Sequence, residues 1–165
     1  MNPSSATRLT PEIRMAKAED IPLLVPLIDS AFAVETFLEG TRTDATRLTA
    51  TMRKGEILLA EDPAGAVLGC VYTEVQGARG YLGQLAVDPA RQGEGTARLL
   101  VLAGEDHLRG KGCEAVDITV LSLRPELLPI YRRYGYVETG TEAFRMSRSL
   151  KSAEHCHCIV MSKRL

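Results

Sequence analysis

Apolar residues recur along the chain with two different periods, and these periods predict where its helices and strands lie. The first helix follows Asp20, which caps it, and its apolar residues keep the helical spacing: Ile21, Leu24, Val25, Ile28 and Phe32. Pro22 falls in the first turn, where a helix leaves the N–H unpaired in any case. A second helix starts at Asp44 and ends at Gly55.

Seven shorter segments show the apolar runs or the alternation typical of strands. They cover residues 13–16, 57–60, 67–75, 81–87, 115–121, 136–141 and 156–161. Two further helices are expected: a long one over 92–108, packed on the sheet through Leu99, Leu100 and Ala103, and a short one near 126–134. Because Pro129 lies inside the short helix, that helix is expected to start late or to bend.

The order of these elements is β-α-α-β-β-β-α-β-α-β-β, which predicts a mixed α/β (α+β) fold. The strand–helix–strand unit over 81–121 is expected to be parallel and right-handed, and the hairpin before it makes the sheet mixed. Residues 1–11 are expected to form a mobile tail and residues 12–165 a single domain, which is long enough for its own core.

Composition and charge argue against several classes of function. Hydrophobic residues make up 45% and charged residues 25%, and the net charge of −1 gives no basic field for nucleic acid. No apolar run approaches the ~20 residues of a membrane span, and the N-terminus lacks the apolar stretch of a secretory signal. The four cysteines lack a disulfide-like spacing and are expected to be reduced, so a cytoplasmic location is expected.

Two glycines stand where the strand over 81–87 gives way to the long helix. Without side chains at Gly93 and Gly95, the amides at the helix start could surround an anion such as a phosphate. A tight turn that needs only the backbone freedom of glycine is the alternative. The segment lacks the G-x-x-x-x-G-K-[ST] string of a P-loop, and Arg98 replaces the last glycine of a dinucleotide fingerprint. A nucleotide-dependent oxidoreductase is therefore disfavoured.

Two motifs occur in the second half of the chain. Residues 92–97, QGEGTA, match the pattern Q/R-x-x-G-x-G/A after a strand that ends in LAV, and PIYRRYGYVETG at 129–140 looks like an LYxxxGF signature. With these motifs and this order of elements, the chain from about residue 13 to 165 resembles the GNAT superfamily of acyl-CoA-dependent N-acyltransferases. The resemblance implies a mostly antiparallel mixed sheet with flanking helices, in which the parallel strands starting at Tyr81 and Ala115 splay apart.

The resemblance also implies a co-substrate and its contacts. Acetyl-CoA would donate an acetyl group to a primary amine, with no metal involved. The pantetheine arm would add like a strand beside Leu85, Ala86 and Val87. The pyrophosphate would lie on the turn and on the first helix amides, formed by Gln92, Gly93, Glu94, Gly95, Thr96 and Ala97. An acyl-CoA-binding module of the same fold without turnover is the alternative to an enzyme.

Tyr131 matches the family tyrosine that protonates the departing CoA thiolate. A phenol with a pKa of about 10 keeps its proton at neutral pH and can donate it. The alternative is a purely structural ring on the buried face of the short helix, with Leu127 and Tyr134. Arg124 stands where relatives often have an asparagine that binds pantetheine. It cannot accept a hydrogen bond, but it could reach a CoA phosphate instead.

The general base is not fixed by the sequence. Many relatives carry a glutamate near the position of Gln84, and an amide cannot take up a proton. Four carboxylates are candidates beside a chain of water molecules: Glu35, Glu39, Glu74 and Asp117.

The sequence does not identify the acceptor, which is either a small-molecule amine or a protein amine. It also does not decide whether the chain forms a homodimer. The loops over 34–43 and 142–155 would form the acceptor pocket and carry no readable motif. Arg145, Arg148 and Lys151 make a basic stretch that is expected to be solvated, with recognition of an acidic acceptor as the alternative. The string HCHC at 155–158 would place only two ligands on each side of a strand, short of the four of a structural zinc site.

Overall fold

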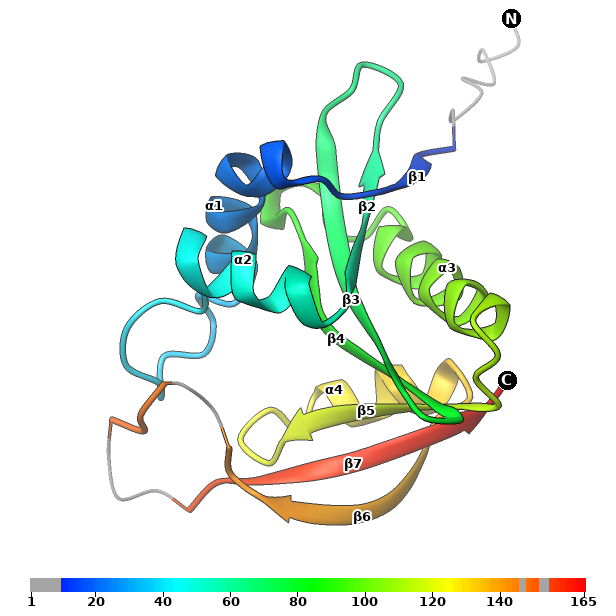
Figure 1. The fold of residues 1–165 in the computed structure, drawn as a ribbon. Coiled ribbons are helices and arrows are strands. Elements are labelled where there is room, and N and C mark those ends of the chain that lie inside the picture. The colour runs from blue at the N-terminus through cyan, green and yellow to red at the C-terminus, as the bar shows by residue number, and fades with distance from the viewer. Residues whose placement is uncertain (1–9, 146–147, 152–154) are drawn as a thin grey trace, which may run out of the picture.

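The computed structural model describes residues 10–145, 148–151 and 155–165, whose strands form a seven-stranded sheet (Figure 1). Residues 1–9 of the expected tail lie outside this part of the chain. The strands are β1 (Glu12–Met15), β2 (Glu56–Glu61), β3 (Val67–Gln76), β4 (Arg79–Val87), β5 (Ala115–Leu121), β6 (Val137–Ala143) and β7 (His157–Arg164). Their order in the sheet is β1-β2-β3-β4-β5-β7-β6. Neighbours run antiparallel except β4 and β5, so the predicted mixed α/β fold is confirmed.

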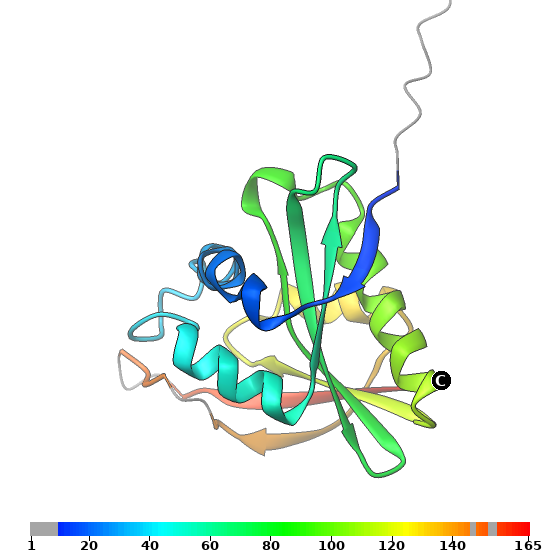
Figure 2. The ribbon, with the colours of Figure 1, turned by 45° about the horizontal axis from the view of Figure 1, so that its top comes forward.

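In the described part of the chain, four α-helices cover the two faces of the sheet (Figure 2). Helices α1 (Ile21–Ala31) and α2 (Ala45–Lys54) pack on one face through a cluster that includes Leu24, Ile28 and Leu48. Helices α3 (Thr96–Gly110) and α4 (Leu127–Arg133) pack on the other, where the buried residues include Leu100, Leu108 and Tyr136. Among the described residues, none of the helices is long and apolar enough to cross a bilayer.

Helix α3 begins four residues later than the sequence predicts, at Thr96 and not at Gln92. The reason is the backbone of the two glycines, since φ is +83° at Gly93 and +85° at Gly95, which is incompatible with a right-handed helix. The buried face of α3 is also displaced from the prediction. Leu100 is fully buried as expected, but Leu99 and Ala103 lie at the margin, and the centre is formed by Leu100, Val101, Gly104 and Leu108.

Strand β4 carries a bulge near its middle. Between the pairs Tyr72↔Gly83 and Cys70↔Ala86, β4 advances three residues while β3 advances two. Gln84 lies in this bulge and has a φ of +44°, the only positive value among the described non-glycine residues. Such a conformation is strained for a side chain with a Cβ atom, and strain of this kind concentrates at functional sites.

The bulge lies just beyond the point where β4 leaves β5. The two parallel strands pair only over Arg79–Tyr81 and Ala115–Asp117, and β5 then continues beside β7 up to Leu121. The part of β4 from Leu82 to Val87 keeps β3 on one side and, among the residues that the structure describes, has no strand partner on the other. This is the splayed pair of parallel strands that the resemblance to the GNAT superfamily implies, and it opens the sheet at one end.

The predicted short helix and the predicted last strand are present, with small shifts in their bounds. Asp20 precedes α1 as expected, but its carboxylate accepts hydrogen bonds from Arg14 and from the Lys17 amide and does not cap the helix. Pro129 is the third residue of α4, so the N–H that it lacks belongs to the first turn and the helix is not broken. Strand β7 begins at His157, and therefore only the second half of HCHC lies in a strand. All four cysteines are free in the structure.

Candidate active site

A pocket of about 860 Å³ opens where β4 and β5 diverge. Its walls come from the end of α1 and the loop after it, the bulged half of β4, the start of α3, the far end of β5, and α4. Tyr131 lines it, and so do all the predicted cofactor-binding residues except Ala86 and Glu94. Residues predicted from separate motifs thus meet in one cavity.

The glycine turn forms one end of this pocket. Helix α3 starts at Thr96, and Leu99 donates the first helical bond to the carbonyl of Gly95, so the preceding helical amides have no partner within the helix. A Cβ built on either Gly93 or Gly95 meets no protein atom within 4 Å, which leaves the space beside the amides open. The left-handed φ values show that the backbone needs glycine as well. Both readings of the glycines therefore find support.

The free edge of β4 forms the floor next to this turn. Leu85 and Val87 line the pocket, whereas Ala86 is 1% exposed and packs towards α1 on the opposite face of the sheet. Since β5 has already separated from β4 here, the main-chain groups on this side are available to an extended ligand.

Tyr131 stands on α4 across the pocket. Its ring makes edge-to-face contacts with Tyr134 and Tyr136, with centroids 6.1 Å and 6.0 Å apart. Burial, together with the neighbouring Tyr134 hydroxyl, raises the pKa of Tyr131 to about 12. The phenol therefore stays protonated at neutral pH and can serve as a proton donor.

The candidate bases find other roles. Glu74 accepts a hydrogen bond from the Tyr72 hydroxyl at 2.7 Å, and Asp117 is paired with Arg79 at 2.6 Å. Neither lines the pocket among its described residues, and neither does Glu39, which is exposed. Glu35 does line the pocket, but its carboxylate is bound by arginines.

Gln84 cannot act as a general base, but its side-chain oxygen can accept a hydrogen bond in the pocket. Its side-chain Oε1 is buried and, within the described part of the chain, has no hydrogen-bond partner. An unpaired buried acceptor is costly, and Gln84 lines the pocket. A ligand N–H is the kind of group that would satisfy it.

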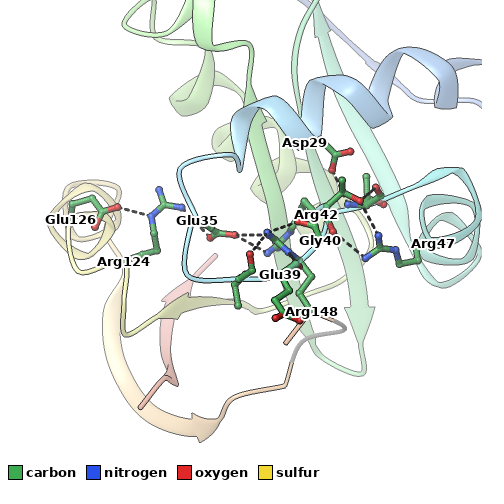
Figure 3. Close-up of polar contacts among 12 residues, drawn as sticks. Asp29, Glu35, Glu39, Gly40, Arg42, Arg47, Arg124, Glu126 and Arg148 are labelled. Atoms are coloured by element: carbon green, nitrogen blue, oxygen red, sulfur yellow. Dashed lines mark hydrogen bonds and ion pairs between the residues drawn. The ribbon is translucent and has the colours of Figure 1, made fainter. Parts of the chain in front are cut away.

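The loop after α1 and the loop before β7 are tied together at the far end of the pocket (Figure 3). The amide of Glu39 donates to the carbonyl of Ser149 at 2.8 Å, and the amide of Lys151 donates to that of Phe37 at 2.9 Å. Arg148 donates to the carbonyls of Leu38, Glu39 and Gly40 and reaches Glu35.

The expectation of a solvated basic stretch is therefore wrong for Arg148. This residue is only 8% exposed because its guanidinium satisfies carbonyls of the other loop. Arg145 and Lys151 are exposed as expected. Within residues 10–145, 148–151 and 155–165, no cluster of three His, Cys, Asp or Glu side chains could hold a metal ion.

Arg124 lies in the loop after β5, and its side chain extends towards the contacts between the loop after α1 and the loop before β7. Its Nη1 lies 3.1 Å from Glu35 Oε2, and its Nε donates to Glu126 at 2.6 Å. The predicted contact of Arg124 with the cofactor stays a prediction, because these ion pairs direct the guanidinium towards the loop after α1.

The family follows from comparison with known proteins. Residues 26–150 match the family model described as the acetyltransferase (GNAT) domain. The chain therefore belongs to the GNAT acetyltransferase family, a family of acyltransferase enzymes. The resemblance carried by the two sequence motifs is confirmed.

Individual relatives agree with this assignment. A mycothiol acetyltransferase from Propionibacterium freudenreichii subsp. shermanii is 34% identical over 90 residues, which cover 52% of this chain and 29% of that protein. One from Saccharomonospora viridis is 28% identical over 163 residues, covering 86% of this chain and 53% of that protein. The chain thus spans about half, or less, of the length of these relatives.

Solved structures share the whole fold. The phosphinothricin acetyltransferase of Sinorhizobium meliloti in complex with acetyl-CoA superposes with a TM-score of 0.76 at 16% identity, covering 95% of this chain and 89% of that one. The ribosomal-protein-alanine N-acetyltransferase of Brucella melitensis gives 0.75 at 18% identity, with 93% and 99% covered. At such identities the likeness shows the fold alone.

Two features of the site escape sequence analysis. Arg42 lines the pocket from the loop after α1, and nothing in the surrounding string TRTD distinguishes it from a surface arginine. The orphan oxygen of Gln84 depends on the bulge, which only the register of β3 and β4 reveals.

Proposed function

We propose that this protein transfers the acetyl group of acetyl-CoA to a primary amine. The observation that carries the proposal is the single pocket that joins the glycine turn, the free edge of β4 and Tyr131. A solved relative of the same fold with acetyl-CoA bound supports the choice of co-substrate. The four free thiols fit a reducing compartment, and we place the protein in the cytoplasm.

In this proposal the start of α3 binds the pyrophosphate. The open space at Gly93 and Gly95 lets phosphate oxygens reach the unpaired amides of the first turn, where the helix dipole also favours an anion. The edge of β4 from Leu85 to Val87 then orients the pantetheine arm through main-chain hydrogen bonds. These contacts bring the thioester to the bulge, next to Gln84.

The reaction needs a neutral amine and a protonated leaving thiol. The amine nitrogen forms the C–N bond as the C–S bond breaks, and Tyr131 gives its proton to the departing sulfur. Gln84 Oε1 accepts a hydrogen bond from the amine and so aims the nitrogen lone pair at the carbonyl. The excess proton on nitrogen passes to water, and water returns a proton to the Tyr131 phenolate, which restores the donor. Water takes this part because, of the described carboxylates that line the pocket, Glu35 and Glu126 are paired with arginine and Glu142 is exposed to solvent.

One experiment distinguishes the proposed enzyme from the alternative, a binding module without turnover. Acetyl-CoA binding is measured by calorimetry, and release of CoA thiol is then followed across a panel of primary amines. We expect binding, together with thiol release that depends on the amine. Binding without release for every amine in the panel would favour the module, and absence of binding would refute the proposal as a whole.

A further inference from the structure

Strand β4 carries a second phenol into the pocket, just before the bulge. Tyr81, Gly83 and Gln84 all line the pocket. A Cβ built on Gly83 would lie 2.7 Å from Cε1 of Tyr81 and 2.9 Å from its hydroxyl oxygen. The ring of Tyr81 therefore lies along the strand over Gly83, and its hydroxyl ends one residue before Gln84. A side chain at position 83 would push the ring out of this place.

The neighbours of Tyr81 hold its ring and leave its oxygen able to accept. Tyr72 on β3 contacts the ring edge to face, with the ring centroids 6.4 Å apart. Thr119 on β5 lies close enough to hydrogen-bond with the Tyr81 hydroxyl, beyond the point where β4 and β5 separate. A hydroxyl group has one donor and two acceptor positions. Whichever of these two hydroxyls donates, at least one lone pair of the Tyr81 oxygen remains for another N–H.

The Tyr81 hydroxyl also lies near the groups that carry the chemistry. Burial raises the pKa of Tyr131, and Tyr134 and Tyr81 raise it further, so Tyr81 lies within electrostatic reach of the proton donor. Burial raises the pKa of Tyr81 as well, which keeps this phenol neutral at neutral pH. Gln84, whose buried Oε1 has no hydrogen-bond partner among the described residues, follows Gly83 directly in the chain. Two neutral oxygens thus lie close to the bulge.

We propose that Tyr81 is an acceptor-binding residue, whose hydroxyl oxygen accepts one N–H of the attacking amine while Gln84 Oε1 accepts the other. This inference rests on the proposed acetyl transfer and adds a contact that selects among its acceptors. A primary amine has two N–H bonds and one lone pair, so two such oxygens direct the lone pair at the thioester carbonyl. As the C–N bond forms, the nitrogen gains positive charge and both N–H groups become stronger donors. The two contacts therefore stabilise the transition state more than the bound amine.

The pair of oxygens distinguishes primary from secondary amines. A secondary amine has a carbon substituent in place of one N–H, and this carbon would meet one of the two oxygens. That oxygen would then lose its hydrogen-bond partner, which is costly in a buried site. A site built to hydrogen-bond a group discriminates strongly against an analogue that lacks the group. The inferred acceptors are therefore primary amines, and their N-methyl derivatives are rejected.

The first arm of the test compares each amine that the panel shows to be acetylated with its N-methyl derivative. Benzylamine with N-methylbenzylamine, and glycinamide with sarcosinamide, are such pairs. We expect kcat/KM for CoA release to be at least about 100-fold lower for the N-methyl member. A difference below about tenfold would overturn the inference and leave acetyl transfer intact. If no amine in the panel is acetylated, the proposed function fails and the inference fails with it.

Variants show whether Tyr81 causes this selectivity. Tyr81→Phe keeps the ring over Gly83 and removes the oxygen. We expect kcat/KM for the primary amine to fall at least about tenfold, mainly through kcat, and that for the N-methyl amine to stay within about threefold. Gly83→Ala should act in the same direction, because its Cβ displaces the Tyr81 hydroxyl. Equal losses for both amines in Tyr81→Phe would make the residue merely structural and overturn the inference.

Tyr72→Phe is the matched control. It also removes a phenol hydroxyl, from the ring that contacts Tyr81, but this hydroxyl donates to Glu74, and Tyr72 is not among the described residues that line the pocket. We expect Tyr72→Phe to keep the wild-type preference for primary amines. Calorimetry should give an unchanged affinity for acetyl-CoA in Tyr81→Phe and Tyr72→Phe, since the lost contact belongs to the acceptor. A wild-type preference in Tyr81→Phe would overturn the inference.

Discussion

Tyr131 is the residue on which the chemistry of the site depends most directly. Its raised pKa has a simple physical cause, since burial and the neighbouring Tyr134 both disfavour the charged phenolate. The pocket thereby keeps a proton donor in its protonated form. The ring also fixes the position of the hydroxyl through its contacts with Tyr134 and Tyr136.

Replacing Tyr131 by Phe should remove the proton and keep the packing. We expect the rate of acetyl transfer to fall about 10²–10⁴-fold, with little change in acetyl-CoA affinity. Single-turnover kinetics measure the step directly. Tyr134→Phe is the control, because it removes a hydroxyl from the same pocket wall. Wild-type rates in Tyr131→Phe would eliminate the residue from the mechanism.

The pH dependence gives an independent check on the same residue. A pKa of about 12 means that the donor form is lost only in strong alkali. An ordinary tyrosine, by contrast, would begin to lose its proton as the pH approaches about 10. The rate of the chemical step in wild type should therefore show no decline from Tyr131 between about pH 8 and pH 10. A decline in that interval that disappears in Tyr131→Phe would show an unshifted pKa.

At the scale of single elements, the turn before α3 serves the backbone and the ligand at once. Replacing Gly95 by Val should strain the backbone at φ +85° and fill the space beside the amides. We expect acetyl-CoA affinity to fall at least tenfold, about 1.4 kcal/mol, as measured by calorimetry. Gly77→Val is the matched control, since Gly77 also has a positive φ and open space around it, in the β3–β4 hairpin. Equal affinities in the two variants would argue that the turn does not bind phosphate.

Helix α3 is attached to the sheet by a narrow row of residues. Leu100 is fully buried, so Leu100→Ala should lower the free energy of unfolding by about 2–5 kcal/mol in a denaturant titration. Leu102→Ala removes the same atoms from a side chain that is 44% exposed, and should change stability by less than about 0.5 kcal/mol. Similar losses in both variants would mean that the buried face is wrongly assigned.

Some of the helices, strands and turns can be predicted from sequence patterns, and other features of the fold cannot. Each helix or strand buries one face, and this burial imposes a periodic pattern of apolar residues on the sequence. The pattern therefore locates the four helices and the strands, and it predicts the burial of Leu24, Ile28 and Leu100. Glycine motifs locate the turn before α3. The bulge at Gln84 has no such signal, since it depends on how two strands align. The arginines around Glu35 come from three distant segments, and no local pattern records that they meet.

At the scale of the whole molecule, the sheet consists of two parts joined by a short parallel ladder. Strands β1 to β4 lie on one side of it and β5, β7 and β6 on the other, with three residue pairs between β4 and β5. The tie between the loop after α1 and the loop before β7 connects the two parts again beyond the open end. Arg148 is the central residue of this second connection.

Arg148→Met should loosen the tie without disturbing the core. We expect faster hydrogen exchange at the amides of Glu39 and Lys151, which bond across the two loops. The amides of β3 and β4 should exchange as in wild type. Arg145→Met, at an exposed position in the same loop, is the control. Unchanged exchange at both amides in Arg148→Met would show that the bridge stands without the guanidinium.

The unpaired edge of β4 has a thermodynamic consequence. A ligand that completes the hydrogen bonding there occupies a place that a strand fills elsewhere in the sheet, and it binds only the folded chain. By mass action, a ligand at one hundred times its dissociation constant would raise the unfolding free energy by about 2.7 kcal/mol. The melting temperature of this protein would then report the acyl-CoA concentration around it, and a thermal scan could rank acyl donors before any acceptor is known.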